Sequence, residues 1–153
     1  MKTAVSFYGA FCLAFFAGLF LPTSAQIRAQ EPLSELRIYV SGVSATQGTI
    51  RVALYQEAAS FLDFEGVAAA AVAPAVEGQT LVVFKDLPPG KYAAALYHDA
   101  NNNEKMDSNW LGIPKEALGF SMARLRTFGP PKFEDCVFAV TGIQRIDIPL
   151  ENN

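Results

Sequence analysis

Short runs of β-branched and aromatic residues, separated by turn-forming residues, recur along this chain and constrain its fold more than any other feature. The runs lie at 36–40, 49–55, 81–84, 91–97, 137–140 and 144–150. Within the second run, Ile50, Val52 and Leu54 alternate with other side chains, which is the period of a strand that buries one face. The pattern predicts an all-β fold, a single antiparallel two-sheet β-sandwich of about seven strands.

The sequence signals for the connections between the runs differ in strength. Residues 86–90, Asp-Leu-Pro-Pro-Gly, form the clearest turn signal, because proline fixes φ and glycine accepts a positive φ. This turn predicts a hairpin between 81–84 and 91–97. In 56–79 the pattern is weaker, and we expect a long connection with at most one irregular strand. Residues 98–126 are expected to form one long polar loop.

The segment 1–25 has the organisation of a secretory signal peptide. A positive start is followed by an almost unbroken apolar run at 4–21, which carries no charge and ends at Pro22. Small residues at 23–25 suit signal peptidase, so we place the cleavage before Gln26. A retained membrane anchor, which needs about 20 apolar residues, is the alternative.

Cleavage would leave a flexible leader at 26–34 and one domain at 35–153, secreted or periplasmic in a bacterium and without a membrane span. The full chain has 12 basic and 15 acidic residues. This mildly acidic balance, without a basic cluster, argues against a nucleic-acid partner. Only Cys136 remains after the signal, so no intrachain disulfide can form. We expect this cysteine to be a buried apolar residue, and the protein to be a monomer.

Oxygen-bearing side chains occupy alternate positions in the loop that follows 91–97. The candidate metal ligands are Asp99, Asn101, Asn103, the main-chain carbonyl of Lys105, Asp107 and Glu116. Calcium takes about six to eight oxygen ligands, and calcium loops supply them at this alternating spacing. The sequence therefore predicts a bound calcium ion with a modest dissociation constant of about 10⁻⁴–10⁻³ M.

Two positions depart from a helix-loop-helix calcium site. Glu104 stands where such a loop needs a glycine turn, and Trp110 stands where it has a bidentate glutamate. Asn102 and Asn103 tolerate a left-handed backbone and could replace the glycine. The alternative is that the Asp and Asn side chains form Asx-turns, which order the loop without an ion.

The loop also carries a long motif, HDxNxNxxxDxxxxGxPxExxGFS, which begins at His98 and ends at Ser121. It resembles the signature of a bacterial secreted family known only as a domain of unknown function, and every fixed position is matched. Residues 51–55 and 87–93 are similar to that family as well, so the resemblance covers nearly the whole domain. It implies an exported β-sandwich, immunoglobulin-like or prealbumin-like, with no established reaction.

The chain departs from the family pattern at a few loop positions. Glu104 replaces a usual glycine, and Ala117, Leu118 and Met122 replace the usual glycine, aromatic residue and asparagine. These departures concern the geometry of the turns.

His98 and Ser121 are the residues that a secreted hydrolase would use, the serine as nucleophile and the histidine as base. Asp99 would point to the opposite side of the strand from His98, so it could not complete a triad there. Ser121 also lacks a GxSxG turn. We therefore expect no catalytic residues and no enzymatic activity, and keep the hydrolase as an alternative.

The loop at 98–121 is the expected contact surface of a binding or structural module. The residues expected to order it or to bind a partner are His98, Trp110, Gly112, Pro114, Gly119, Phe120 and Ser121. Trp110 could stack on a partner, an unknown extracytoplasmic protein or glycan, or it could be an anchor buried over the sheet edge. An accessory subunit of an envelope assembly is a further alternative, which an exposed apolar patch around Trp110 would favour.

Overall fold

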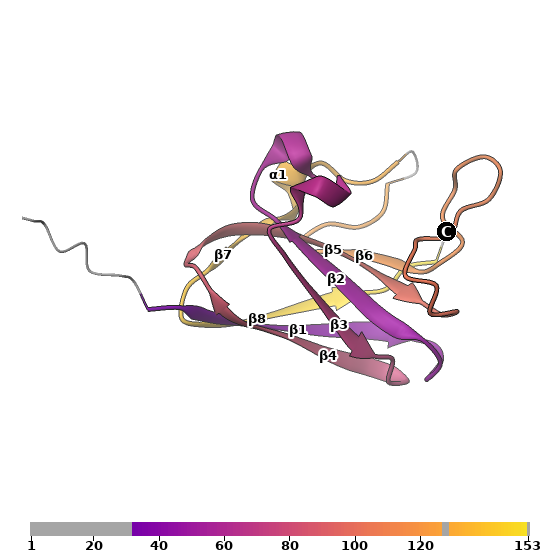
Figure 1. Ribbon diagram of the computed structural model, residues 1–153, viewed down its shortest axis with the longest axis horizontal. Helices are drawn as coiled ribbons and strands as arrows, with labels where there is room; N and C mark the ends of the chain where they lie inside the picture. Colours follow the sequence, from indigo (N-terminus) through magenta and orange to yellow (C-terminus); the bar gives the residue numbers. More distant parts are fainter. Residues whose placement is uncertain (1–31, 127–128, 153) are drawn as a thin grey trace, which may run out of the picture.

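The computed structural model describes residues 32–126 and 129–152, which form two β-sheets packed against each other (Figure 1). The three-stranded sheet has the order β4-β1-β8, and the five-stranded sheet has the order β3-β2-β5-β6, with β7 also paired to β5. The strands are β1 (Ser34–Val43), β2 (Thr49–Tyr55), β3 (Ala69–Pro74), β4 (Gly78–Leu87), β5 (Gly90–Asp99), β6 (Leu118–Phe120), β7 (Val137–Val140) and β8 (Ile143–Pro149). The short helices are η1 (Ala58–Ser60), η2 (Phe64–Gly66) and α1 (Phe133–Cys136). The predicted all-β fold with two sheets is confirmed.

The core lies between the sheets and follows the alternation of the strands. In β1, Leu36, Ile38 and Val40 are fully buried, and Ile50 is buried in the same way in β2. Burying each such side chain contributes about 1.5–3 kcal/mol to stability. Among the described residues, the core cluster begins in β1 and ends just after β8. A protein that begins at residue 26 therefore retains every residue of this cluster.

The predicted hairpin between 81–84 and 91–97 is wrong, because β4 and β5 belong to different sheets. β4 pairs with β1, and β5 pairs with β2. Pro88 and Pro89 between them have no N–H groups, so they cannot extend a two-stranded ladder. The chain instead crosses from one sheet to the other at this point. The Tyr92 hydroxyl holds the crossing by donating to the Pro88 carbonyl over 2.8 Å.

One strand pair also departs from the predicted antiparallel arrangement, since β8 runs parallel to β1. β7 pairs with β5, so the chain changes sheet at Thr141 and Gly142 before it enters β8. The Glu35 amide secures this crossing by donating to the Gly142 carbonyl over 2.8 Å. A tight hairpin forces antiparallel pairing, and a crossing between sheets does not.

Two strands lie in segments with weak sequence patterns. β3 occupies the long connection, where at most one irregular strand was expected, and it pairs with β2. β6 lies within the expected loop and pairs with β5. Its central residue, Gly119, packs so closely that a Cβ atom would lie 2.9 Å from both Leu96 Cδ1 and Ile148 Cγ2.

A second small apolar cluster surrounds Cys136, which is fully buried as predicted. The Phe61 and Phe133 rings meet edge to face there, with centroids 5.7 Å apart. Burial raises the pKa of the Cys136 thiol to about 11. The thiol is therefore both enclosed and protonated at neutral pH.

The predicted signal peptide at 1–25 lies outside the described residues. No helix within the described ranges is long and apolar enough to cross a membrane. In Figure 1 the chain enters β1 at one end of the sandwich, and the loop after β5 leaves from the opposite end. The loop thus projects away from the point where the domain begins.

Gly119→Ala is expected to destabilise the domain by about 1–3 kcal/mol, because the new methyl group overpacks β6 against β5 and β8. The matched control is Gly90→Ala, where a Cβ atom would meet its nearest neighbours at an ordinary 3.6 Å. Urea unfolding followed by circular dichroism measures both variants. Equal losses of stability in the two variants would contradict the close packing described for Gly119.

Candidate functional site

The long loop begins at Asp99, the last residue of β5, whose carboxylate is fully buried. Arg51 on the neighbouring β2 donates from Nε to Asp99 Oδ2 over 2.8 Å. From the loop side, the Asn103 amide donates to Oδ1 over 3.1 Å and the Glu104 amide donates to Oδ2 over 3.0 Å. One carboxylate therefore ties the loop to the adjacent strand.

These donors decide the charge state of Asp99. Burial by itself would raise the pKa of this carboxyl group, but Arg51 and the amides of Glu104 and Asn103 outweigh it and hold the pKa below its ordinary value. Glu104 also contacts Arg51, at 3.1 Å from Nη2, but its side chain is 75% exposed. Such a solvent-exposed ion pair adds little. The buried Asp99 contact is the one that fixes the loop.

Asx-turns order the next residues of the loop. Asn101 Oδ1 accepts from the Asn103 amide over 3.1 Å, and Asn103 Oδ1 accepts from the Lys105 amide over 2.9 Å. Asn102 and Glu104 adopt positive φ values of 55° and 65°. Glu104 thus has the left-handed backbone for which calcium loops use glycine, and the Asp99 contact to its amide helps to hold this conformation.

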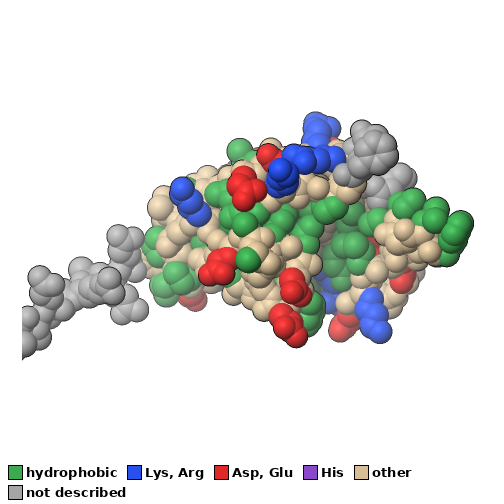
Figure 2. Space-filling model, turned by 90° about the horizontal axis from the view of Figure 1, so that it is seen from above, with side chains coloured by type: hydrophobic (Ala, Val, Ile, Leu, Met, Phe, Trp, Pro, Cys, Tyr) green, Lys and Arg blue, Asp and Glu red, His purple; other side chains and the backbone are tan. Residues whose placement is uncertain are grey.

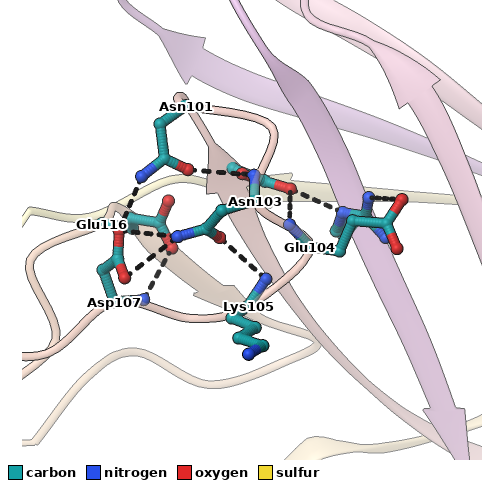
Figure 3. Close-up of polar contacts among 8 residues, drawn as sticks. Asn101, Asn103, Glu104, Lys105, Asp107 and Glu116 are labelled. Carbon is teal, nitrogen blue, oxygen red and sulfur yellow. Dashed lines mark hydrogen bonds and ion pairs between the residues drawn. The ribbon is translucent and has the colours of Figure 1, made fainter.

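Asp107 and Glu116 close the far side of this loop segment. Figure 3 shows the side chains of Asn101, Asn103 and Asp107 turned toward one another, with Glu116 beside them. Asp107 Oδ2 accepts from Asn101 Nδ2 over 2.7 Å and from Asn103 Nδ2 over 3.1 Å. The Asp107 amide donates to Glu116 Oε2 over 3.1 Å.

Glu116 is the least compensated of these acids. It is 9% exposed, and its Oε1 atom has no hydrogen-bond partner among the described residues. Burial raises the pKa of its carboxyl group, and the charges of Asp99 and Asp107 raise it further, although the amides of Asp107 and Ala100 offset part of the effect. A buried carboxylate with a free oxygen and two acidic neighbours favours a cation or a proton.

The structure brings part of the predicted ligand set together. The side chains of Asn101, Asn103, Asp107 and Glu116 lie around one point of the loop. Asp99 instead directs both oxygens to Arg51 and to loop amides, and Lys105 contributes its amide to Asn103. No three His, Cys, Asp or Glu side chains in the described ranges are grouped so that they alone could hold a metal ion.

Beyond Asp107 the loop forms a narrow hairpin whose end is held by Asn109. Its Oδ1 accepts from the amides of Leu111 and Ile113 over 2.9 and 3.0 Å. Its own amide donates to the Ile113 carbonyl over 2.8 Å, and its carbonyl accepts from the Gly112 amide over 2.9 Å. Gly112 takes a positive φ of 78° to close the turn.

The hairpin, together with the residue that precedes Asp107, exposes a group of apolar side chains that we call the apolar tip. Its members are Met106 (47% exposed), Trp110 (90%), Leu111 (61%) and Ile113 (46%). Figure 2 shows apolar side chains gathered at the end of the molecule that lies farthest from the N-terminal trace. The expectation that Trp110 is an anchor buried over the sheet edge is wrong, because its side chain is 90% exposed, and hydrogen bonds of Asn109 fix the turn instead.

The other residues of the motif hold the ends of the loop. The ring Nε2 of buried His98 donates to the Gln47 carbonyl over 2.8 Å. Ser121 Oγ accepts from the Ala94 amide over 2.8 Å and donates to the Cys136 carbonyl over 2.6 Å. Ala94 and His98 are four residues apart on β5, a distance of about 13 Å along the strand. The serine and the histidine of the hydrolase alternative are therefore not brought together.

The remaining predicted positions are structural parts of the same loop. Phe120 is buried in the second cluster, and Gly119 fills the tight contact of β6. Pro114 pairs with Ser108 across the hairpin. Together with Gly112 they shape the loop and do not contribute exposed functional groups.

Comparison with known proteins identifies a family. The model of a family described as an uncharacterised protein conserved in bacteria, DUF2141, matches residues 38–147. The chain belongs to the DUF2141 family. The resemblance to an uncharacterised bacterial family is thereby confirmed, and the matched range includes the loop and most of both sheets. No curated protein and no solved structure matches the chain.

Sequence reasoning missed Arg51, Gln47 and Asn109 as parts of this site. Arg51 and Gln47 come from β2 and the turn before it, and their roles depend on which strand lies beside β5. Asn109 carried a local signal, since asparagine followed closely by glycine is typical of a turn.

Asp99→Asn is expected to lower the stability of the domain by about 2–3 kcal/mol at neutral pH, because it removes a buried charge that accepts three hydrogen bonds. The folded-state pKa of Asp99 lies below its ordinary value of 3.8, so its stabilising contribution is present above that value. The difference between wild type and variant should shrink as the pH falls through the lowered pKa. Glu104→Gln, the exposed control, should cost less than about 0.5 kcal/mol. Urea unfolding at several pH values measures both, and a pH-independent difference would count against the ionised Asp99.

Proposed function

We propose that this protein is an exported, non-catalytic binding module whose contact surface is the apolar tip. The observation that carries the proposal is the 90% exposure of Trp110 on a turn fixed by hydrogen bonds. Export is supported by the N-terminal pattern of a charged start, an apolar run and small residues before Gln26.

An ordered loop with exposed apolar side chains is costly to maintain in water. Flexible loops usually fold such side chains back onto the domain, and contiguous exposed apolar patches in soluble proteins mark interaction sites. Here the base of the hairpin prevents the tip from folding back onto the domain. Ser108 pairs with Pro114, and the Lys115 amide donates a hydrogen bond to the Asp107 carbonyl over 2.8 Å. A contact surface fixed in this way loses little conformational entropy when it binds.

The sandwich supplies the rigid base of the loop. The buried residues Asp99, His98 and Ser121 each form hydrogen bonds that fix an end of the loop, to Arg51 on β2, to Gln47 in the turn before β2 and to Ala94 on β5. A projecting loop on a rigid β-scaffold is a common arrangement among proteins that recognise a partner through a loop.

An accessory subunit of an envelope assembly is the second candidate. The exposed patch around Trp110 favours it, because a permanent partner would cover these side chains. The hydrolase alternative has no comparable support, since the Ser121 hydroxyl is engaged with Ala94 and Cys136 at a distance from His98.

We further propose that calcium binds beside the tip, at the point where Asp107, Glu116, Asn101 and Asn103 converge. Support comes from the unpartnered, buried Oε1 of Glu116 and from the nearby Asp107 carboxylate. The Lys105 carbonyl is a further oxygen of the type that calcium prefers. The amide oxygens of Asn101 and Asn103 accept from loop amides here and would turn toward the ion when it binds. Asp99 would keep its contact to Arg51 and position the loop around the ion.

Photo-crosslinking tests the proposed surface in the living bacterium. Benzoylphenylalanine placed at position 111 should give a covalent adduct of the exported protein, because Leu111 lies at the centre of the contact. The same group placed at position 72, where Val72 is 52% exposed on β3, is the control and should give none. Absence of any adduct at position 111, with the protein correctly exported, would contradict the proposal.

A calcium titration of thermal unfolding tests the ion site, using residues 26–153. The melting temperature should rise with calcium up to about 10 mM, and a variant with Asp107→Asn and Glu116→Gln should lose this response. Glu104→Gln, which leaves the four converging side chains intact, should retain it. The folded-state pKa of Glu116 is raised, so the calcium effect should weaken as the pH falls through that pKa and the carboxyl group takes up a proton. An unchanged melting temperature in the wild type would leave the Asx-turns as the basis of loop order.

A further inference from the structure

The structure points to a lipid bilayer surface as the partner of the apolar tip, with Trp110, Leu111 and Ile113 inserted at the headgroup boundary. This inference rests on the proposed function, because it names the partner of the same contact surface.

The tip has the dimensions of an interfacial insertion. It stands on the hairpin that begins where the Lys115 amide donates to the Asp107 carbonyl. Leu111 lies four residues from each member of this pair, which corresponds to at most about 13 Å at the rise of an extended chain, and to less because the chain turns after Asn109. Protein segments that lie at a membrane surface bury their apolar side to a depth of about 5–10 Å.

Four backbone amides of the tip are satisfied within the turn, which lowers the cost of removing this segment from water, while the Trp110 amide has no hydrogen-bond partner among the described residues. The amides of Asn109, Leu111, Gly112 and Ile113 all donate within the turn, to the side chain or main chain of Asn109 and to the Ile113 carbonyl. No charged residue occurs from Ser108 to Pro114. Internal satisfaction of polar groups is the main requirement for a segment that enters lipid.

The size and chemistry of the tip fit lipid better than a protein or a glycan. Its four side chains expose on the order of 400 Å², about half of the ~800 Å² that each partner buries in a standard protein interface. A sugar would require free polar side chains beside Trp110 for its hydroxyl groups, whereas the Oδ1 atom of neighbouring Asn109 already accepts from the amides of Leu111 and Ile113. A convex tip of Trp, Leu and Ile has the composition of an interfacial anchor, because Trp is enriched at the headgroup level.

The charges at the base of the tip suit anionic headgroups. Lys105 and Lys115 are exposed, and neither forms an ion pair within the described residues. Of the nearby acids, Glu116 is buried, and Asp107 accepts hydrogen bonds from asparagine amides inside the loop. Glu104, whose side chain is 75% exposed, is paired with Arg51. Two unpaired lysines behind an apolar tip would contact lipid phosphates when the tip is inserted.

Trp110 allows a direct test, because it is the only tryptophan in the chain. Residues 26–153 are mixed with vesicles of phosphatidylglycerol and phosphatidylcholine, and the fluorescence is recorded with and without a water-soluble quencher. We expect a blue shift of the emission, protection from the quencher and co-flotation with the vesicles. No shift and no co-flotation would overturn the inference.

Matched variants locate the contact. Leu111→Asp with Ile113→Asp keeps the reporter and should weaken vesicle partitioning by more than about tenfold. Phe64→Asp removes an exposed aromatic residue in η2, 92% exposed, and should leave partitioning unchanged. Lys105→Glu with Lys115→Glu should weaken partitioning to anionic vesicles about tenfold. Equal partitioning by the tip variant and the wild type would overturn the inference.

The two proposals fail in different ways. A protein adduct at position 111 in cells, together with no vesicle binding, would overturn the lipid assignment and leave the binding module intact. A lipid adduct at that position would support both.

Discussion

The buried carboxylate of Asp99 is the interaction on which the arrangement of the loop depends. Removing a charge from water costs several kcal/mol unless partners replace the lost hydration. The partners here come from two directions, Arg51 on β2 and the amides of Asn103 and Glu104 in the loop. Because neither side alone satisfies the charge, the loop cannot separate from the sandwich cheaply. The scaffold and the projecting surface therefore behave as one folded unit.

The sequence predicted the parts of the fold that follow from local periodicity. Alternation at residues such as Ile50 and Val52 identified the strands and the inward face, since burial repeats every second residue. It could not distinguish a hairpin from a crossing at Pro88 and Pro89, because the same turn chemistry serves both. The parallel pairing of β8 with β1 was also not predictable from local sequence patterns, since it joins residues near opposite ends of the chain.

The candidate site was predictable to a similar extent. The alternating oxygen-bearing residues correctly marked an ordered polar loop, but alternation alone did not tell which oxygens accept from amides and which remain open. Asp99 was expected at a metal and instead meets Arg51, a contact that required knowledge of the neighbouring strand. The exposure of Trp110 was equally unpredictable, because it depends on the hydrogen bonds of Asn109 in the turn. Whether a large aromatic residue is an anchor or a contact is decided by tertiary structure.

The buried thiol of Cys136 can report local opening of the second apolar cluster. Cys136 is fully buried, and its raised pKa keeps it in the unreactive thiol form. An alkylating reagent can therefore reach it only after the cluster of Phe61, Phe120 and Phe133 has separated. This cluster lies between α1 and the five-stranded sheet, apart from the main core. The rate of alkylation would report how often this corner opens while the two sheets stay packed.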